Sequence, residues 1–233
     1  MARDLHQVKR VLVVVSSLLV CATAWGLEGP RFPADHGLDS AELTKRKHEA
    51  QKMVKNLKRN KGKFERFMAE GRIRTTLCRK CHGDEGVSAT PGVPSLAGQS
   101  PVYLVDQFER FAEGRRNDFL MSGLAKSLTE EDKLRLAVYY ASLAPPPPVA
   151  GDPELVARGE VVYGSACIRC HGRDGRGEMG YARLAGQRPD YVVKRLKEFR
   201  ERSATANRPM AGQTGGLTEP DLEAVAAYVA TLP

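Results

Sequence analysis

Apolar residues follow a helical spacing through most of the chain beyond residue 40. In the segment 219–232 they occur at i, i+3, i+4 and i+7, at Leu222, Val225, Ala226 and Val229. This spacing places them on one buried stripe of a helix. Comparable patterns predict helices near 101–113, 130–143 and 189–201 and before each of two cysteine motifs, and no segment has strand alternation with comparable support. The expected fold class is therefore all-α.

Residues 40–70 have the pattern of an amphipathic helix. Its apolar positions recur at near-heptad spacing, at Leu43, Ala50, Met53, Leu57, Phe64, Phe67 and Met68. The other face carries basic residues, at Lys45, Arg46, Lys47, Lys52, Lys55, Lys58, Arg59, Lys61 and Lys63. Gly62 is expected to break or bend this helix. Two interpretations are open: a solvated helix docked on the domain that follows, or a basic arm for an acidic partner or an anionic membrane surface.

The rest of the chain is an internal repeat. The tetrapeptide Leu-Ala-Gly-Gln at 96–99 returns at 184–187, and the dipeptide Leu-Thr that ends at Thr129 returns at Thr218. Each of these threonines is followed three residues later by aspartate, which is typical of a helix N-terminus. Each repeat is thus expected to end in a capped helix.

Four consecutive prolines, Pro145 to Pro148, separate the two repeats. Such a run favours an extended spacer and cannot continue a helix. We therefore expect one domain at 64–144, a proline-rich linker at 145–152 and a second domain at 153–233.

Each repeat contains one Cys-x-x-Cys-His motif. The first consists of Cys78, Cys81 and His82, and the second of Cys167, Cys170 and His171. Two thiols three residues apart lie about one helical turn apart, so both can reach the vinyl groups on one porphyrin edge, and the next residue brings an imidazole to the iron. A single motif could also be a zinc half-site or a redox dithiol. Its duplication favours two covalently bound haem c groups.

The second axial ligand decides whether such a haem transfers electrons or catalyses a reaction. The candidates are Met121 and Met210, each 43 residues after the first cysteine of its motif and each in a segment whose weak helical pattern predicts a loop. Met179 is a rival without a counterpart in the first repeat. His/Met coordination fills both axial positions and suits the transfer of single electrons. The carbonyl of Pro94, or of Ala182 at the aligned position, is expected to accept the other N–H of the proximal imidazole.

The first 24 residues have the composition of a secretory signal. A basic start and an apolar run at 11–20 precede a cleavage site of the A-x-A type at 22–24. The run is shorter than the roughly twenty residues of a membrane-spanning helix, although an uncleaved anchor stays open. Because c-type haem is attached outside the bacterial cytoplasm, we expect a periplasmic protein, free or membrane-associated, whose residues 25–63 are a lead-in and the basic arm.

Charge and cysteine content narrow the possible partners. Residues 40–77 hold twelve Lys or Arg against four Asp or Glu, while the two haem regions are nearly neutral, so the net charge of +8 is a local feature. Nucleic acid is not an expected partner of an exported chain.

The fifth cysteine, Cys21, lies in the signal, which leaves no cysteine of the remaining chain for a disulfide framework. His36 and His48 lie in the arm without repeat counterparts and are expected to be exposed rather than to bind metal.

The motif order resembles a class I cytochrome c: Cys-x-x-Cys-His-Gly, then Leu-Ala-Gly-Gln, then Met-x6-Leu-Thr-x-x-Asp and a closing helix. Two such units in tandem, over about 64–233, resemble the cytochrome c4 family. The resemblance implies two all-α domains with facing haem edges that pass electrons toward a terminal oxidase. It carries the family's haem ligands over to Cys78, Cys81, His82, Met121, Cys167, Cys170, His171 and Met210. The basic arm and the stiff linker depart from the simple family pattern.

Three functions are consistent with these features. The leading hypothesis is an electron carrier, not an enzyme, that works with an oxidase, a dehydrogenase or a quinol-oxidising complex. The alternative is the haem-bearing subunit of a dehydrogenase, similar to flavocytochrome c, in which the arm docks the catalytic partner. The third is a two-haem enzyme similar to a bacterial peroxidase, which needs an open or displaceable axial site.

Overall fold

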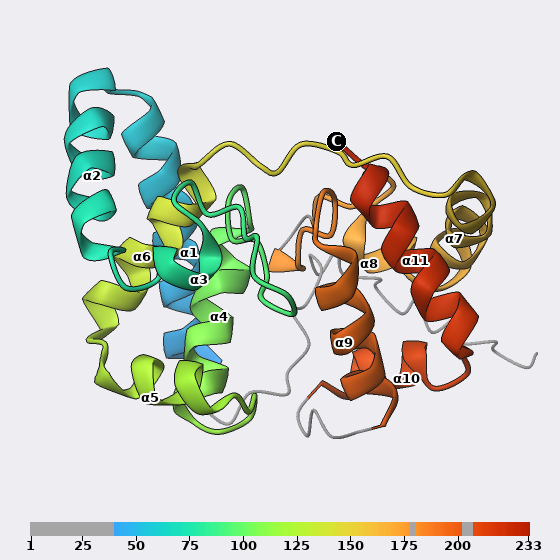
Figure 1. The fold of residues 1–233 in the computed structure, drawn as a ribbon. Coiled ribbons are helices and arrows are strands. Elements are labelled where there is room, and N and C mark those ends of the chain that lie inside the picture. The colour runs from blue at the N-terminus through green and yellow to red at the C-terminus, as the bar shows by residue number, and fades with distance from the viewer. Residues whose placement is uncertain (1–39, 178–179, 202–206) are drawn as a thin grey trace, which may run out of the picture. The chain divides into compact units, whose positions relative to one another are not determined.

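The computed structural model of the protein describes residues 40–177, 180–201 and 207–233. The expected signal at 1–24, with Cys21, as well as His36, Met179 and the side chain of Leu43, lies outside what it describes. The helices are α1 (Ser40–Lys58), α2 (Lys61–Arg74), α3 (Arg79–His82), α4 (Pro101–Ala112), α5 (Phe119–Ser127), α6 (Glu130–Ser142), α7 (Pro153–Ala166), α8 (Ile168–His171), α9 (Pro189–Arg200), α10 (Arg208–Thr214) and α11 (Glu219–Thr231) (Figure 1). The all-α prediction is confirmed. None of the helices in the described ranges combines the length and apolar content that a bilayer crossing requires.

Buried apolar side chains form two clusters, one in each half of the chain. In the first half, residues 40–144, the helices α1, α4 and α6 pack together around Ala50, Phe67, Leu104, Val105, Ala137, Val138, Tyr139 and Tyr140. In the second half, residues 153–233, the helices α7, α9 and α11 pack around Tyr163, Val192, Leu196, Leu222, Val225, Ala226 and Val229. The stripe predicted for the last helix is therefore buried in the second core.

The helices that close the repeats begin at the predicted caps. The Asp132 N–H donates a hydrogen bond to Oγ1 of Thr129 at 3.1 Å, and the Thr218 N–H donates to Oδ2 of Asp221 at 2.9 Å. These bonds satisfy N–H groups that a helix start leaves without a partner. The predicted starts of α6 and α11 are confirmed.

The amphipathic segment before the first motif forms two helices. α1 ends at Lys58 and α2 begins at Lys61, so the break lies before Gly62, which is inside α2. The Asn60 side chain caps α2 by accepting a hydrogen bond from the Lys63 N–H at 3.0 Å. Asparagine favours a helix start because it pairs with an orphan N–H, whereas a lone glycine only weakens a helix. The prediction that Gly62 breaks the helix was therefore wrong.

Helix α1 is docked on the first half, against α4 and α6 (Figure 1). One of its basic residues does not lie on the solvated face where the pattern placed it. The Lys47 side chain is only 7% exposed, and its Nζ lies 3.1 Å from Oδ1 of Asp106 in α4. Arg46 is half-buried beside Glu109 of the same helix, at 3.0 Å. A basic side chain can be buried when its charge meets a partner, and this partner lies 59 residues away in the sequence.

Two buried glycines allow close helix crossings. A Cβ atom at Gly159 of α7 would lie 2.0 Å from the carbonyl oxygen of Ala224 in α11. A Cβ atom at Gly71 of α2 would lie 2.2 Å from the ring of Tyr139 in α6. Glycine inside a helix lowers stability, so its presence at both crossings indicates that the close approach requires it. The helix before each motif is thereby held against the helix that closes the same repeat.

The proline-rich linker packs on the Leu-Ala-Gly-Gln turn of each repeat. A Cβ atom at Gly98 would lie 2.7 Å from Cβ of Pro145, and one at Gly186 would lie 2.7 Å from the carbonyl oxygen of Pro146. Both glycines also have positive φ, at 66° and 70°, which other residues rarely adopt. The linker is thus a packed segment and not only a spacer.

Candidate haem-attachment sites

Each Cys-x-x-Cys-His motif forms one helical turn. The His82 N–H donates to the carbonyl oxygen of Cys78 at 2.9 Å, and the His171 N–H donates to that of Cys167 at 3.0 Å. These i→i−4 bonds belong to α3 and α8, each of which ends at its histidine. The two thiols of each motif therefore lie about one turn apart, as predicted.

The two motif histidines are buried and oriented by backbone carbonyls. Nδ1 of His82 lies 2.9 Å from the carbonyl oxygen of Pro94, and Nδ1 of His171 lies 2.9 Å from that of Ala182. Both predicted acceptors are confirmed. A carbonyl oxygen can only accept, so Nδ1 carries the proton and Nε2 keeps the lone pair with which a proximal histidine binds iron. Burial lowers the pKa of both imidazoles, although the carbonyl bonds oppose this shift, and both rings are neutral at neutral pH.

The motif cysteines are half-buried and unpaired. Burial raises the pKa of the Cys167 thiol to about 11 and also raises the pKa of Cys78. A reactive redox dithiol needs the opposite shift, a thiol with a lowered pKa. Among the residues that the structure describes, no group of three or more His, Cys, Asp or Glu side chains is arranged to hold a metal ion. The raised thiol pKa values thus disfavour a redox dithiol and are compatible with thioether attachment of haem.

Two buried N–H groups near the motifs also fit haem. The Nε atoms of Arg79, inside the first motif, and of Arg183, next to the carbonyl that holds the second motif histidine, are buried without a hydrogen-bond partner. A buried donor left unpaired is costly. The propionate carboxylates of haem are acceptors of opposite charge, so the residues present suit this cofactor in chemistry as well as in spacing.

The candidate methionines lie in short helices and not in loops. Met121 is the third residue of α5, and Met210 is the third residue of α10. Asp118 and Asn207 cap these helices and accept hydrogen bonds from the two methionine N–H groups at 3.0 and 3.2 Å. The loop prediction was wrong because helices of nine and seven residues are too short to show a clear apolar period. The two methionines nevertheless hold equivalent positions, and both are half-buried.

Two further groups near the sites were not found from the sequence. The hydroxyl of Tyr163 donates to the carbonyl of Gly172, directly after the second motif, at 2.6 Å. Arg116 of the first half donates to the hydroxyl of Tyr191 in the second half at 2.8 Å. Tyr103 and Tyr191 each lie four residues after the glutamine of a Leu-Ala-Gly-Gln turn, so the repeat could have drawn attention to Tyr191. The repeat does not show which residue Tyr191 contacts.

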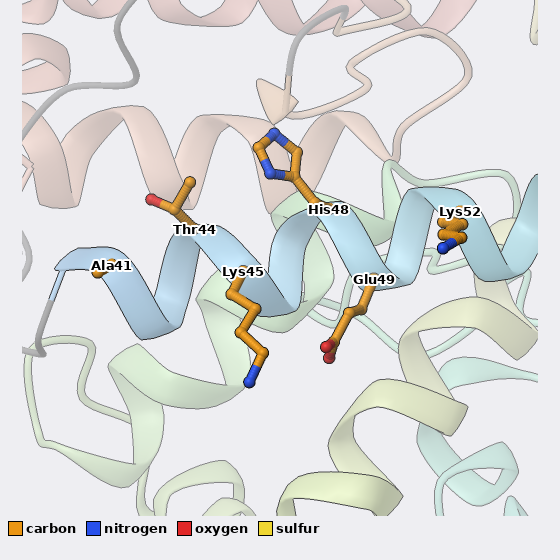
Figure 2. Close-up of a pocket in the computed structure, with 6 residues that line it drawn as sticks. All are labelled: Ala41, Thr44, Lys45, His48, Glu49 and Lys52. Atoms are coloured by element: carbon orange, nitrogen blue, oxygen red, sulfur yellow. The ribbon is translucent and has the colours of Figure 1, made fainter.

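A hollow on the surface of α1 belongs to neither haem site. Its lining residues come from this one helix: Ala41, Thr44, Lys45, His48, Glu49 and Lys52 (Figure 2). Figure 2 shows that His48 projects to the opposite side from Lys45 and Glu49, and its side chain is exposed, as predicted. Because the lining side chains come from one helix and point to opposite sides of it, they do not form a binding site for a ligand.

Comparisons with known proteins agree with this geometry. Residues 154–229 match the family described as cytochrome C oxidase, cbb3-type, subunit III. A cytochrome c4 from Pseudomonas aeruginosa is 34% identical over 174 residues, which cover 69% of this chain and 86% of that protein. A thiosulfate dehydrogenase electron acceptor from Thiomonas intermedia is 36% identical over 171 residues, which cover 67% of this chain and 78% of that protein. The crystal structure of reduced recombinant cytochrome c4 from Pseudomonas stutzeri matches with a TM-score of 0.66 and 29% identity, over 71% of this chain and 98% of that one.

The fold and these relatives define the class of this protein: it is an electron-transfer cytochrome with two covalently bound haem c groups. Within that class, the chain belongs to the cytochrome c4 family, as the motif order predicted.

Proposed function

We propose that this protein is exported to the periplasm and carries electrons one at a time between a respiratory donor and an acceptor such as a terminal oxidase. The proposal rests above all on the two buried histidines, each held by a carbonyl through Nδ1 with Nε2 left for iron. Bound haem supplies a one-electron ferric/ferrous couple. Met121 and Met210 are the proposed sixth ligands, and two filled axial positions leave no open place for a substrate.

We also propose the domain division expected from the sequence: 1–24 signal, 25–63 lead-in and arm, 64–144 and 153–233 haem domains, and 145–152 linker. The two separate buried clusters support the pair of haem domains. The family match to residues 154–229 falls wholly within the second domain.

A redox titration of the purified holoprotein, followed optically, tests the proposed function. We expect two low-spin haems, each taking up one electron at high potential, and the weak near-infrared band of ferric iron bound by methionine. A high-spin haem of low potential, together with turnover of hydrogen peroxide, would contradict the proposed function. Such a result would indicate a two-haem enzyme similar to a peroxidase.

A second function is supported by two relatives that are named as electron acceptors of thiosulfate dehydrogenase. The protein from Thiomonas intermedia is named for accepting electrons from thiosulfate dehydrogenase. This chain would then be the haem-bearing partner of a dehydrogenase. To separate the two functions, the rate of haem reduction is measured with two electron donors: thiosulfate dehydrogenase with thiosulfate, and a quinol-oxidising complex with quinol. Faster reduction by thiosulfate dehydrogenase would support the role as a dehydrogenase partner.

The exposed basic residues of α1 and α2 are proposed to dock an acidic protein partner. Lys52, Lys55, Lys58 and Lys63 all have exposed side chains. Changing these four lysines to glutamine should slow electron transfer about tenfold at low salt, the lower end of the rate gain from electrostatic steering. The loss should shrink at high salt, where exposed charges are screened. Stopped-flow rates with the oxidase or the dehydrogenase, measured over a range of salt concentrations, give this comparison.

The matched control changes four exposed basic residues of the second half that lie outside its Cys-x-x-Cys-His motif: Arg158, Arg173, Arg176 and Lys194. If only this second set slows the reaction, docking lies on the second half and the arm is a scaffold. Co-sedimentation with anionic lipid vesicles that disappears with the first set would show that the arm binds a membrane surface.

A further inference from the structure

The glutamine of each Leu-Ala-Gly-Gln turn reaches into the opposite half of the protein. All described residues belong to one compact unit. Oε1 of Gln99 accepts a hydrogen bond from the Arg183 N–H at 2.6 Å, and Nε2 of Gln99 donates to the Arg183 carbonyl at 2.9 Å. Gln187 pairs with Ser95 in the same way, with both distances at 2.9 Å. Each amide thus binds both polar groups of one backbone residue across the two halves.

The first of these contacts ends on the peptide group that holds a proximal histidine. The Arg183 N–H and the Ala182 carbonyl belong to the same peptide group. That carbonyl accepts the Nδ1–H of His171 at 2.9 Å. A continuous hydrogen-bonded path therefore runs from Gln99, in the first half, through one peptide group to the histidine of the second half.

The second contact is built in the same way. The Ser95 N–H and the Pro94 carbonyl share one peptide group, and this carbonyl accepts the Nδ1–H of His82 at 2.9 Å. The path from Gln187 thus ends at the histidine of the first half. Because the repeat produces the same crossed arrangement twice, a shared role is a better explanation than an isolated packing contact.

Both glutamines are held rigidly. Each is 6% exposed, so water does not replace the amide readily. Oε1 of Gln99 also accepts from the Ser100 N–H at 2.9 Å, and Oε1 of Gln187 accepts from the Arg188 N–H at 3.0 Å. These bonds tie each side chain to the start of α4 or α9, so the acceptor atom has a fixed position.

A peptide group transmits polarisation because its N–H and C=O are conjugated. An acceptor on the N–H shifts electron density toward the carbonyl oxygen, and hydrogen bonds in such a chain strengthen one another. A stronger bond from Nδ1–H makes the imidazole a more basic iron ligand, which favours ferric iron. We propose that Gln99 and Gln187 are positioning residues that set the reduction potential of the haem in the opposite half.

This inference rests on haem attachment at the two motifs and on none of the proposed sixth ligands or partners. The test uses the holoprotein with Gln99→Met, which keeps the side-chain volume and removes the amide. Gln187→Met is the reciprocal variant, and Gln51→Met on the exposed face of α1 is the matched control. Two quantities are measured: the potential of each haem, assigned by NMR of haem methyl groups, and the solvent exchange of each histidine Nδ1 proton in the ferrous state.

We expect a crossed pattern. Gln99→Met should raise the potential of the haem bound by His171 and speed exchange of the Nδ1 proton of that histidine about fivefold, the factor that corresponds to roughly 1 kcal/mol. Gln187→Met should do the same at His82, and Gln51→Met should change neither. Equal shifts at both haems, shifts only within the substituted half, or lower stability with unchanged potentials and exchange would each show that the glutamines only pack the two halves together.

Discussion

Replacing Met121 or Met210 with alanine is expected to remove the sixth ligand from one haem and lower its reduction potential by on the order of 100 mV, a fraction of the roughly 0.8 V that axial ligands can span. Thioether favours ferrous iron, so its loss stabilises the ferric form. The substituted haem should become high-spin and lose its near-infrared band, while the other haem keeps both properties. Optical redox titration and near-infrared spectra of the two holoproteins measure these changes.

Other methionines of the chain serve as controls. Met68 is half-buried against the first core, so Met68→Ala should lower stability and leave both haem spectra unchanged. Met179→Ala should also leave them unchanged. An intact near-infrared band and potential in Met210→Ala, with loss of the band in Met179→Ala, would transfer the role of ligand to Met179 and contradict the proposed assignment.

Replacing Gly159 with alanine is expected to lower the free energy of unfolding of the second half by about 3 kcal/mol, the upper part of the range for overpacking a core. The added Cβ would lie 2.0 Å from the Ala224 carbonyl oxygen. This oxygen belongs to the backbone of α11, so the contact is relieved only if one helix moves. The same helix leads into the second motif, and the shift should therefore also perturb the ferric spectrum of that haem.

Gly164 provides a matched control in the same helix. A Cβ atom there meets no atom within 4 Å. Gly164→Ala should therefore raise stability by about 0.5–1 kcal/mol, because alanine is the better helix former. Calorimetric unfolding of both ferrous holoproteins gives the comparison, and equal effects of the two substitutions would contradict the close crossing of α7 and α11.

Features set by residues that are near in sequence could be predicted well. The Cys-x-x-Cys-His turn is one such feature, because the position of His82 relative to Cys78 follows from a single i→i−4 bond. The starts of α6 and α11 are another, since Thr129 and Thr218 lie three residues from their capping partners. The alignment of the two repeats also located the Pro94 and Ala182 carbonyls, which bind the histidines 12 and 11 residues before them.

Features that depend on distant partners were decided only by the tertiary structure. The amphipathic pattern predicts that Lys47 is exposed to solvent, because such a pattern places every charged residue on the solvated face. In the folded protein its side chain is buried and forms a hydrogen bond with Asp106, 59 residues away. The repeat identifies Gln99 but gives no partner for it, and only the folded structure shows its hydrogen bond to Arg183, 84 residues away in the other half. The sequence by itself determined the all-α class, the repeat and the helical turn of each Cys-x-x-Cys-His motif, because local spacing is enough to define them. Which buried charges pair, and how one half contacts the other, depends on the packing of whole helices, and no local pattern contains that information.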